Sequence, residues 1–393
     1  MKHAWMVMMG LLVASAGCAT HQQSKAAAEL RWSETRGKVL LSVAEEQFDT
    51  GDFDNAKSSA SEALAMSPNL VGAHLLLARV AIEQTRYADA EEHLKVAEES
   101  RPDDARVAYL LAVVEERREH YPQALKLYEK ARALDPKNPA CVLASVEVMV
   151  RMDRPAEALA LIEGKLTSMD PTAGMYVAAG RLATMVGRHD RAAVHYAQAR
   201  SLLPEDAELQ AQLAKAYFFS GQHDLAIREL EMITGQTKEP GPVWMRTMLG
   251  ESHLAAGQAS KAKAVFIDVT RREPRVAHHW ANLAKAALES NDLSRASLSS
   301  REALAIDPSQ ADAAVVLGYV LLRQGQGEQA KAMLLGMART HPENATVLCL
   351  LGRSYQVLGQ QDRAAKCFGA ALALEPNNPV MRRLASVTVD KGP

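Results

Sequence analysis

A proline recurs along this sequence at a spacing of 34 residues, or close to twice that, and this period constrains the fold more than any other feature. The recurring prolines are Pro68, Pro102, Pro136, Pro204, Pro274, Pro308, Pro342 and Pro376. An alanine lies twelve residues before each of these prolines. Where the period lacks its proline, Ala158 and Ala226 hold the equivalent position. The complete set is Ala56, Ala90, Ala124, Ala158, Ala192, Ala226, Ala262, Ala296, Ala330 and Ala364. A larger side chain would overpack a site where two helix backbones approach closely, so the period indicates stacked helix pairs.

The segment Ala345–Pro376 shows how one unit is built. Leu348, Leu351 and Tyr355 lie at i, i+3 and i+7, which places them on one face of a helix. Gly359 is expected to end this helix, because the left-handed conformation after a helix is least costly for glycine. A second apolar stripe follows, and the closing proline disfavours helix in the residue before it. The unit is therefore predicted to be a helix–turn–helix.

This pattern resembles the tetratricopeptide repeat (TPR), a 34-residue helix–turn–helix unit. The resemblance covers residues 37–376 as ten units, and Trp280, Leu283 and Ala284 match the repeat especially well. It implies an all-α TPR solenoid, a right-handed superhelix in which each unit is stabilised by stacking on its neighbours.

The chain is divided where the period begins, breaks or ends. The predicted parts are a signal peptide (1–18), a tether and lead-in helix (19–36), repeats 1–4 (37–170), repeats 5–6 with a loop (171–242), repeats 7–10 (243–376), and a C-terminal capping helix and tail (377–393). The loop Gly235–Pro242 is two residues longer than the period allows, so it is either a length variant or a bend in the solenoid.

The N-terminus has the features of an export signal. The apolar run Ala4–Ala16 suits a signal peptide and is too short to span a bilayer comfortably. It ends in Ser15-Ala16-Gly17-Cys18, which resembles the bacterial lipoprotein lipobox except at Ser15, where that family prefers an aliphatic residue. The resemblance implies lipidation of Cys18, with plain secretion and an uncleaved anchor as alternatives. Ala19 after the cysteine favours the outer membrane, by resemblance to enterobacterial sorting.

Charge and motifs exclude several function classes. The formal net charge is −2 with no long run of one sign, whereas nucleic-acid binding needs a basic face. The sequence contains no nucleotide-binding loop, no Gly-x-Ser-x-Gly and no His-Glu-x-x-His. We therefore predict no enzyme, no catalytic residue and no cofactor.

The cysteines and histidines do not predict a metal site. Cys141, Cys349 and Cys367 are expected to be buried free thiols, and no Cys/His spacing fits zinc. His278-His279 with His253 is the best histidine grouping, but no carboxylate or cysteine is expected to complete it. These histidines are interpreted as surface or packing residues.

The resemblance to TPR proteins implies a concave binding groove, lined by the first helix of each repeat at its second, fifth, ninth, twelfth and thirteenth positions. Carried over by position, the candidates are Arg181, Lys215, Phe218, Phe219, Trp244, Lys285, Tyr319 and Arg353. A cationic groove with aromatic anchors suits an extended, partly acidic peptide or a glycan. An ordinary solvated helix surface is the alternative.

Together these features predict a non-enzymatic scaffold for protein partners, lipid-anchored on the periplasmic side of a bacterial outer membrane. TPR lipoproteins of type IV pilus and secretin assembly, and of exopolysaccharide export, are similar. The alternative is an adaptor that binds a polysaccharide or a cell-wall enzyme. The partner and the oligomeric state are left open.

Overall fold

The computed structural model describes the backbone of residues 2–236 and 241–389, and the side chains of residues 25, 27–234 and 241–384. Over the described backbone the chain forms 21 α-helices and no β-strand. Most of these helices are 13 or 14 residues long and are joined by short turns, as the 34-residue period requires. The predicted all-α solenoid of helix–turn–helix repeats is confirmed.

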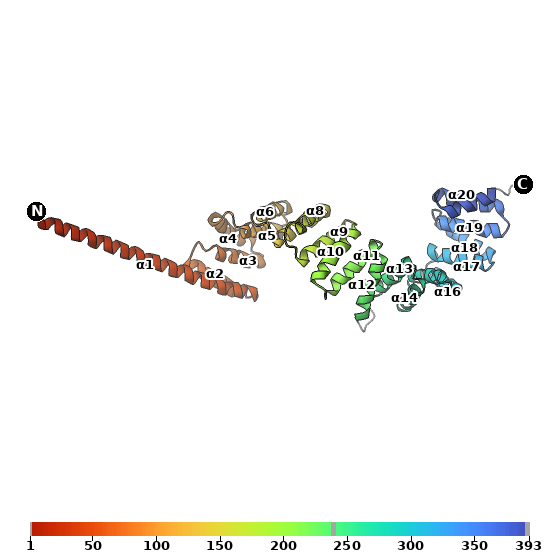
Figure 1. The fold of residues 1–393 in the computed structure, drawn as a ribbon, viewed down its shortest axis with the longest axis horizontal. Helices are drawn as coiled ribbons and strands as arrows, with labels where there is room; N and C mark the ends of the chain where they lie inside the picture. The colour runs from red at the N-terminus through yellow and green to blue at the C-terminus, as the bar shows by residue number, and fades with distance from the viewer. Residues whose placement is uncertain (1, 237–240, 390–393) are drawn as a thin grey trace. The chain divides into compact units, whose positions relative to one another are not determined.

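The chain divides into two compact units, and the first is Met1–Gly187. Its helices follow one another in chain order, each packed on the next (Figure 1). They are α1 (Lys2–Asp49), α2 (Phe53–Met66), α3 (Val71–Glu83), α4 (Tyr87–Ser100), α5 (Ala105–Arg117), α6 (Tyr121–Leu134), α7 (Pro139–Arg151), α8 (Pro155–Leu166) and α9 (Ala173–Met185).

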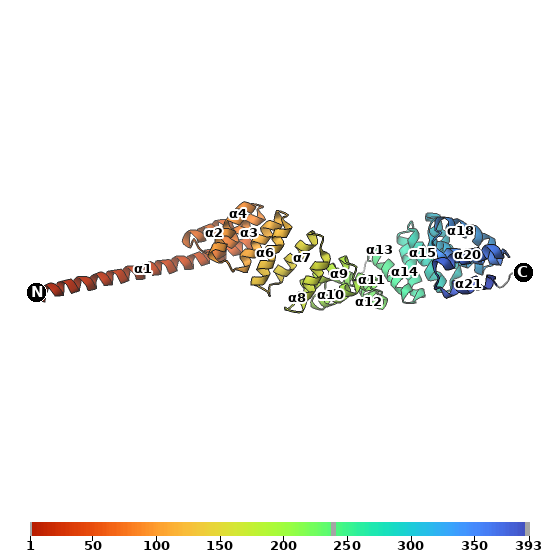
Figure 2. The same ribbon diagram turned by 90° about the horizontal axis from the view of Figure 1, so that it is seen from above.

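The second unit, Arg188–Pro393, continues the same plan, and Figure 2 shows its helix pairs from a second direction. Its helices are α10 (His189–Leu202), α11 (Ala207–Phe219), α12 (His223–Gln236), α13 (Val243–Ala255), α14 (Ala259–Arg272), α15 (Ala277–Glu289), α16 (Leu293–Ile306), α17 (Ala311–Arg323), α18 (Gly327–Thr340), α19 (Ala345–Val357), α20 (Gln361–Leu374) and α21 (Pro379–Val389). The division at Gly187 falls inside the predicted fifth repeat.

The N-terminal segment is more regular than the sequence suggested. Helix α1 runs unbroken from Lys2 to Asp49, so the residues expected to form a tether before the lead-in helix are helical as well. Good helix formers such as Gln22, Lys25 and the alanines after it explain this continuity. The side chains of the predicted signal peptide, including the Cys18 thiol, lie outside the described residues. Among the helices that are described, none is both long and apolar enough to cross a membrane.

The turns between paired helices place one residue in the left-handed conformation. Gly359, at φ +73°, is one of the glycines that the sequence assigned to this role. The same position is held by Thr85 at φ 57°, where Arg86 N donates to the carbonyl of Ala81 at 2.7 Å and closes the helix end. Glu119 and Asp153 also adopt positive φ, at a conformational cost that glycine avoids. Stacking of the neighbouring helices therefore imposes the turn even without glycine.

The recurring small residues lie where the two helices of a pair meet. Ala296 and Ala364 have no exposed surface. A Cβ atom added to Gly352 would lie 2.7 Å from the Phe368 ring of the paired helix, and one added to Gly250 would lie 2.7 Å from Phe266. Both phenylalanines are fully buried. Where the second helix carries phenylalanine, the small site of the first helix must therefore be glycine.

The last helix covers the end of the repeats, as expected. Met381 of α21 is buried in a cluster with Ala345 and Ala371 of the preceding helix pair. The fourth repeat also forms its pair, α7 and α8, although it has Val146, which is buried, at the position where the other repeats have alanine or glycine. Of the long loop, Gly235 and Gln236 belong to α12, and residues 237–240 lie outside the described part of the chain.

We predict that Gly352→Ala destabilises the last helix pairs by about 1–3 kcal/mol, because the new methyl group overlaps a buried ring that has no room to move. Gly369→Ala is the matched control, since this glycine lies on the paired helix α20 and a Cβ there meets nothing within 4 Å. The control should be stabilising by about 0.5–1 kcal/mol, because glycine is unfavourable inside a helix. Chemical denaturation measures both. Equal effects of the two substitutions would contradict close packing at the small site.

Candidate functional site

The first helices of the second unit carry two grooves. The first, which we name the arginine groove, lies on α17, α19 and α21 and has a volume of about 790 Å³. Each of these helices contributes one arginine to its lining: Arg323, Arg353 and Arg383. All three lie at the positions within a repeat that the sequence predicted to face a partner.

The floor and walls of the arginine groove are aliphatic. Leu322 and Leu350 are half-buried, whereas Val357 and Val380 are 55% and 62% exposed. Tyr319 also lines the groove. Exposed branched residues gathered beside cations form a surface that an amphipathic ligand would cover.

Two of the arginines in this groove lie beside neutral groups. The Arg323 guanidinium donates to the Tyr319 hydroxyl at 3.2 Å, and Arg353 donates to the Gln356 side-chain oxygen at 2.6 Å. No carboxylate lines the groove, and neither of these two arginines forms an ion pair within the described part of the chain. Arg323 and Arg353 therefore present positive charge that no carboxylate of the groove lining compensates.

The second groove, which we name the aromatic groove, lies mainly on α11 and α13 and has a volume of about 630 Å³. Phe218, Phe219 and Trp244 form its apolar wall, with the two phenylalanine rings in edge contact at 5.2 Å between centroids. Its charged lining residues are the carboxylates Glu251 and Glu273.

Lys215 is engaged with the aromatic wall. Its Nζ atom lies 4.2 Å from the centroid of the Trp244 ring, which is within the range of a cation–π contact. The predicted combination of a cationic row with aromatic anchors is thus divided in the structure. Phe218, Phe219 and Trp244 lie with carboxylates, whereas Arg353 lies in a groove with aliphatic residues and Tyr319.

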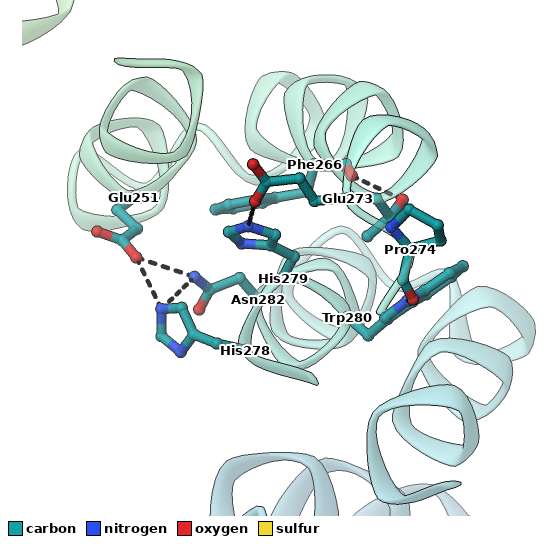
Figure 3. A network of polar contacts seen from close by, with 9 residues as sticks. Glu251, Phe266, Glu273, Pro274, His278, His279, Trp280 and Asn282 are labelled. Carbon is teal, nitrogen blue, oxygen red and sulfur yellow. Dashed lines mark hydrogen bonds and ion pairs between the residues drawn. The ribbon is translucent and has the colours of Figure 1, made fainter. Parts of the chain in front are cut away.

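A polar network joins α13 to α15 beside the aromatic groove (Figure 3). The Glu251 carboxylate accepts from the Asn282 side-chain amide at 2.9 Å and lies 3.1 Å from His278 Nε2. This hydrogen bond raises the pKa of His278 above its ordinary value of 6.5, since the carboxylate favours the imidazolium. His279, which is buried, pairs through Nε2 with Glu273 at 2.9 Å.

The sequence did not indicate these carboxylate neighbours, because Glu251 and Glu273 come from α13 and from the turn after α14, at distances in sequence that no local motif reveals. Even so, the searched residues contain no group of three or more ligand-type side chains that could hold a metal ion.

The three cysteines with described side chains are free thiols, as predicted. Cys141 is buried, as expected. Cys349 and Cys367 were also expected to be buried, but they are only half-buried. Burial raises the pKa of each thiol, so the unreactive protonated form is favoured.

The first unit carries a smaller pocket of about 250 Å³ with mixed charge. Glu45, Arg79 and Arg106 line it together with Tyr109. The Arg79 guanidinium stacks over the Phe48 ring at 4.1 Å, so its position is fixed by an internal contact. Because the lining of this pocket carries both positive and negative side chains, it does not favour a ligand of one charge.

Comparison with known families identifies the repeat. A family model described as "Tetratricopeptide repeat" matches residues 47–114 and 117–164. The chain contains tetratricopeptide repeats. A second model, described as "Cilia and flagella-associated protein 70 C-terminal domain", matches residues 213–392.

Among curated proteins, Tetratricopeptide repeat protein 8 of Caenorhabditis elegans is 24% identical over 185 residues, which is 47% of this chain and 36% of that protein. This TPR chain thus covers about a third of its relative. Similar solved structures include the APC/C heterotetramer Cut9-Hcn1 (17% identity, TM-score 0.45, covering 91% of this chain and 75% of that one) and Naa15/Naa10 bound to HypK (11%, TM-score 0.43, 90% and 66%). MamA is 21% identical with a TM-score of 0.39, over 43% of this chain and 92% of that one.

The structure places the predicted groove residues of this TPR chain in different surroundings. Tyr319 and Arg353 lie in the arginine groove, and the three aromatic residues Phe218, Phe219 and Trp244 lie in the aromatic groove. Lys285 is exposed on α15 and lines neither groove, and Arg181 is exposed on α9 of the first unit.

Arg323 and Arg383 were missed, although both lie at groove positions of their repeats. Their positions in the sequence could have indicated this. Arg323 is the thirteenth residue of α17 and Arg383 is the fifth residue of α21, and both positions are expected to line the groove. Glu273 could not be found this way, because it lies in a turn.

We predict that Glu251→Gln lowers the pKa of His278, because a neutral amide favours the imidazolium less than a carboxylate does. Since the folded pKa is raised, this pair stabilises the fold fully below pH 6.5 and the contribution is lost as pH rises through the folded pKa. The substitution should therefore destabilise more at acidic than at alkaline pH. NMR titration of the imidazole measures the pKa. The control is Glu289→Gln on the same helix as His278; an unchanged His278 pKa in both variants would contradict the assignment.

Proposed function

We propose that this TPR protein is a non-enzymatic scaffold that holds an extended, acidic segment of a partner protein in the arginine groove. The observation that supports this most directly is the lining of that groove, where three arginines from three successive first helices surround an aliphatic floor without a carboxylate. TPR proteins typically bind protein partners, which agrees with this proposal.

The chemistry of the groove favours a peptide over a glycan. Guanidinium groups recognise carboxylates with paired, charge-assisted hydrogen bonds. The exposed Val357 and Val380 would cover aliphatic side chains placed between the acidic ones. A peptide that alternates acidic and aliphatic residues satisfies both features, whereas a glycan gains little from a branched aliphatic floor.

The proposed setting is the periplasmic face of a bacterial outer membrane, with the protein anchored by lipid on Cys18. The support for this setting is the lipobox-like ending Ala16-Gly17-Cys18 after an apolar run. There the scaffold would help to assemble a type IV pilus or secretin, or an exopolysaccharide export system. An adaptor for a polysaccharide or a cell-wall enzyme is the related alternative.

A second setting is favoured by one comparison. The match of residues 213–392 to the C-terminal domain of a cilia and flagella-associated protein supports a scaffold in a ciliary or flagellar assembly. The arginine groove would act in the same way in either setting, because its lining is independent of the N-terminal segment.

The double variant Arg323→Glu with Arg353→Glu tests the groove. We expect its affinity for a blocked synthetic peptide of alternating glutamates and leucines to fall at least about tenfold, or about 1.4 kcal/mol. Isothermal titration calorimetry at low salt measures this, after circular dichroism shows unchanged helicity and melting.

Arg301→Glu with Arg339→Glu is the matched control, because it changes the net charge equally on exposed sites of α16 and α18 outside the groove. If the control variant binds the peptide with wild-type affinity, the loss in the Arg323/Arg353 variant comes from the groove and not from the change in net charge. Equal losses in the two double variants would refute the arginine groove as the peptide site.

Cys18→Ser tests the anchor. If the cysteine carries lipid, the variant expressed in a bacterium should move from the membrane fraction to the soluble fraction, and incorporation of labelled fatty acid should cease. A variant that stays in membranes at high salt, or a wild-type protein that takes up no label, would remove the lipoprotein proposal and favour the second setting.

A further inference from the structure

We propose that the aromatic groove is a second subsite for the same partner segment, and that it takes an aliphatic or aromatic side chain next to a lysine or arginine. This inference rests on the proposed function, since the segment is the one held by the arginine groove. The occupant would be bipolar, with a basic apolar part on α11 and α13 and an acidic part on α17, α19 and α21.

The apolar half of the subsite is open to solvent. Phe219 is 58% exposed and Trp244 is 38% exposed, although both line a groove. Met248 adds an adaptable contact at the same place. Large aromatic side chains are uncommon at solvated surfaces and are frequent anchors at binding surfaces, where one ring gives a large contact area.

The carboxylates give the subsite its preference for a cation. Glu251 lies beside His278 and Asn282, and Glu273 beside His279. In the part of the chain that the structure describes, neither carboxylate forms an ion pair with a lysine or an arginine. The histidine and amide partners orient the two carboxylates, and none of them carries the permanent positive charge of a lysine or an arginine. A lysine or arginine of the partner would supply the missing opposite charge.

Lys215 restricts where that cation binds. Because its ammonium group already lies over the Trp244 ring, the partner's cation is expected at the carboxylates and not on this ring. The remaining exposed surface of Trp244 and Phe219 is left for an uncharged side chain. Lys215 thus contacts one lining residue, Trp244, while the charged lining residues of the groove are acidic.

The two grooves lie on first helices of one compact unit and have opposite charge. Neighbouring packed helices are about 8–10 Å apart, so three steps from α13 to α19 cover roughly 30 Å. An extended chain advances about 3.3 Å per residue, so the basic and acidic parts would be separated by roughly ten residues. A segment with one charge throughout would meet repulsion at one groove, which gives selectivity as well as affinity.

The test uses the full chain and three blocked synthetic peptides. The acidic peptide alternates glutamate and leucine, and the basic peptide carries lysines around a tryptophan. The bipolar peptide joins the two through a flexible glycine–serine spacer of about thirty residues, whose root-mean-square length is roughly 30 Å. Wild-type protein should bind the bipolar peptide at least about tenfold more tightly than the acidic peptide, because linked sites raise the effective concentration of the second contact.

Glu251→Gln with Glu273→Gln should reduce bipolar binding to the level of the acidic peptide while leaving acidic-peptide binding unchanged. Phe219→Ala should have a similar but smaller effect through the apolar half. The matched control, Glu289→Gln with Glu302→Gln, removes the same charge from exposed sites on α15 and α16 and should bind as wild type. Melting and helicity are checked for every variant.

The two proposals fail in different ways. If the bipolar peptide binds no more tightly than the acidic one, or if its affinity is unchanged by the Glu251/Glu273 double variant, the second subsite is overturned and the arginine groove stands. If the acidic peptide does not bind wild-type protein, the arginine groove fails. In that case the basic peptide tests the aromatic groove separately. If the basic peptide binds and the Glu251/Glu273 double variant weakens this binding, the groove is a cation site. If the basic peptide does not bind in this way, the cation site is overturned.

Discussion

The structure depends on the close approach of paired helices at one small residue on each. Ala296 has no exposed surface, and Gly352 faces the Phe368 ring so closely that a single methyl group would overlap it. Contact at this distance fixes the rotation of each helix about its own axis. Once that rotation is set, the residues that face away from the partner helix are also set. The two grooves are therefore consequences of core packing, since the same residues could not lie side by side on helices rotated differently.

This dependence explains how much of the fold the sequence could predict. The period, the small sites and most turns follow from residues whose size or backbone freedom is required, such as Ala364 and Gly359. The turns at Thr85 and Glu119 could not be found by composition, because there tertiary packing imposes a conformation that the local residues do not prefer. The unbroken helix α1 was missed because its N-terminal part was interpreted as a signal peptide and tether. There the local residues do favour helix, and the helix continues through the whole segment.

The sequence predicted which face of the repeats carries the candidate site, but not which side chains contact one another there. A repeat position tells which face a side chain is on, and Tyr319 and Arg353 are indeed together in one groove. It does not tell which neighbour the side chain contacts. Lys215 and Arg353 occupy the same phase, yet one lies over Trp244 and the other beside Gln356. Long side chains choose among several contacts within reach, and that choice depends on residues one repeat away or in a turn, as with Glu273.

Opposite charge on two parts of one unit is compatible with the energetics of a solenoid. Contacts are nearest-neighbour, so the groove on α17, α19 and α21 does not have to be balanced by the groove on α11 and α13 for the fold to be stable. At moderate ionic strength, charges about 30 Å apart are well screened from one another. Each groove can therefore carry its own charge at small cost, and a segment that spans both would gain from each in turn. Selectivity for such a segment then comes from the order of charges along the repeats, while the shape of the backbone stays common to the whole repeat class.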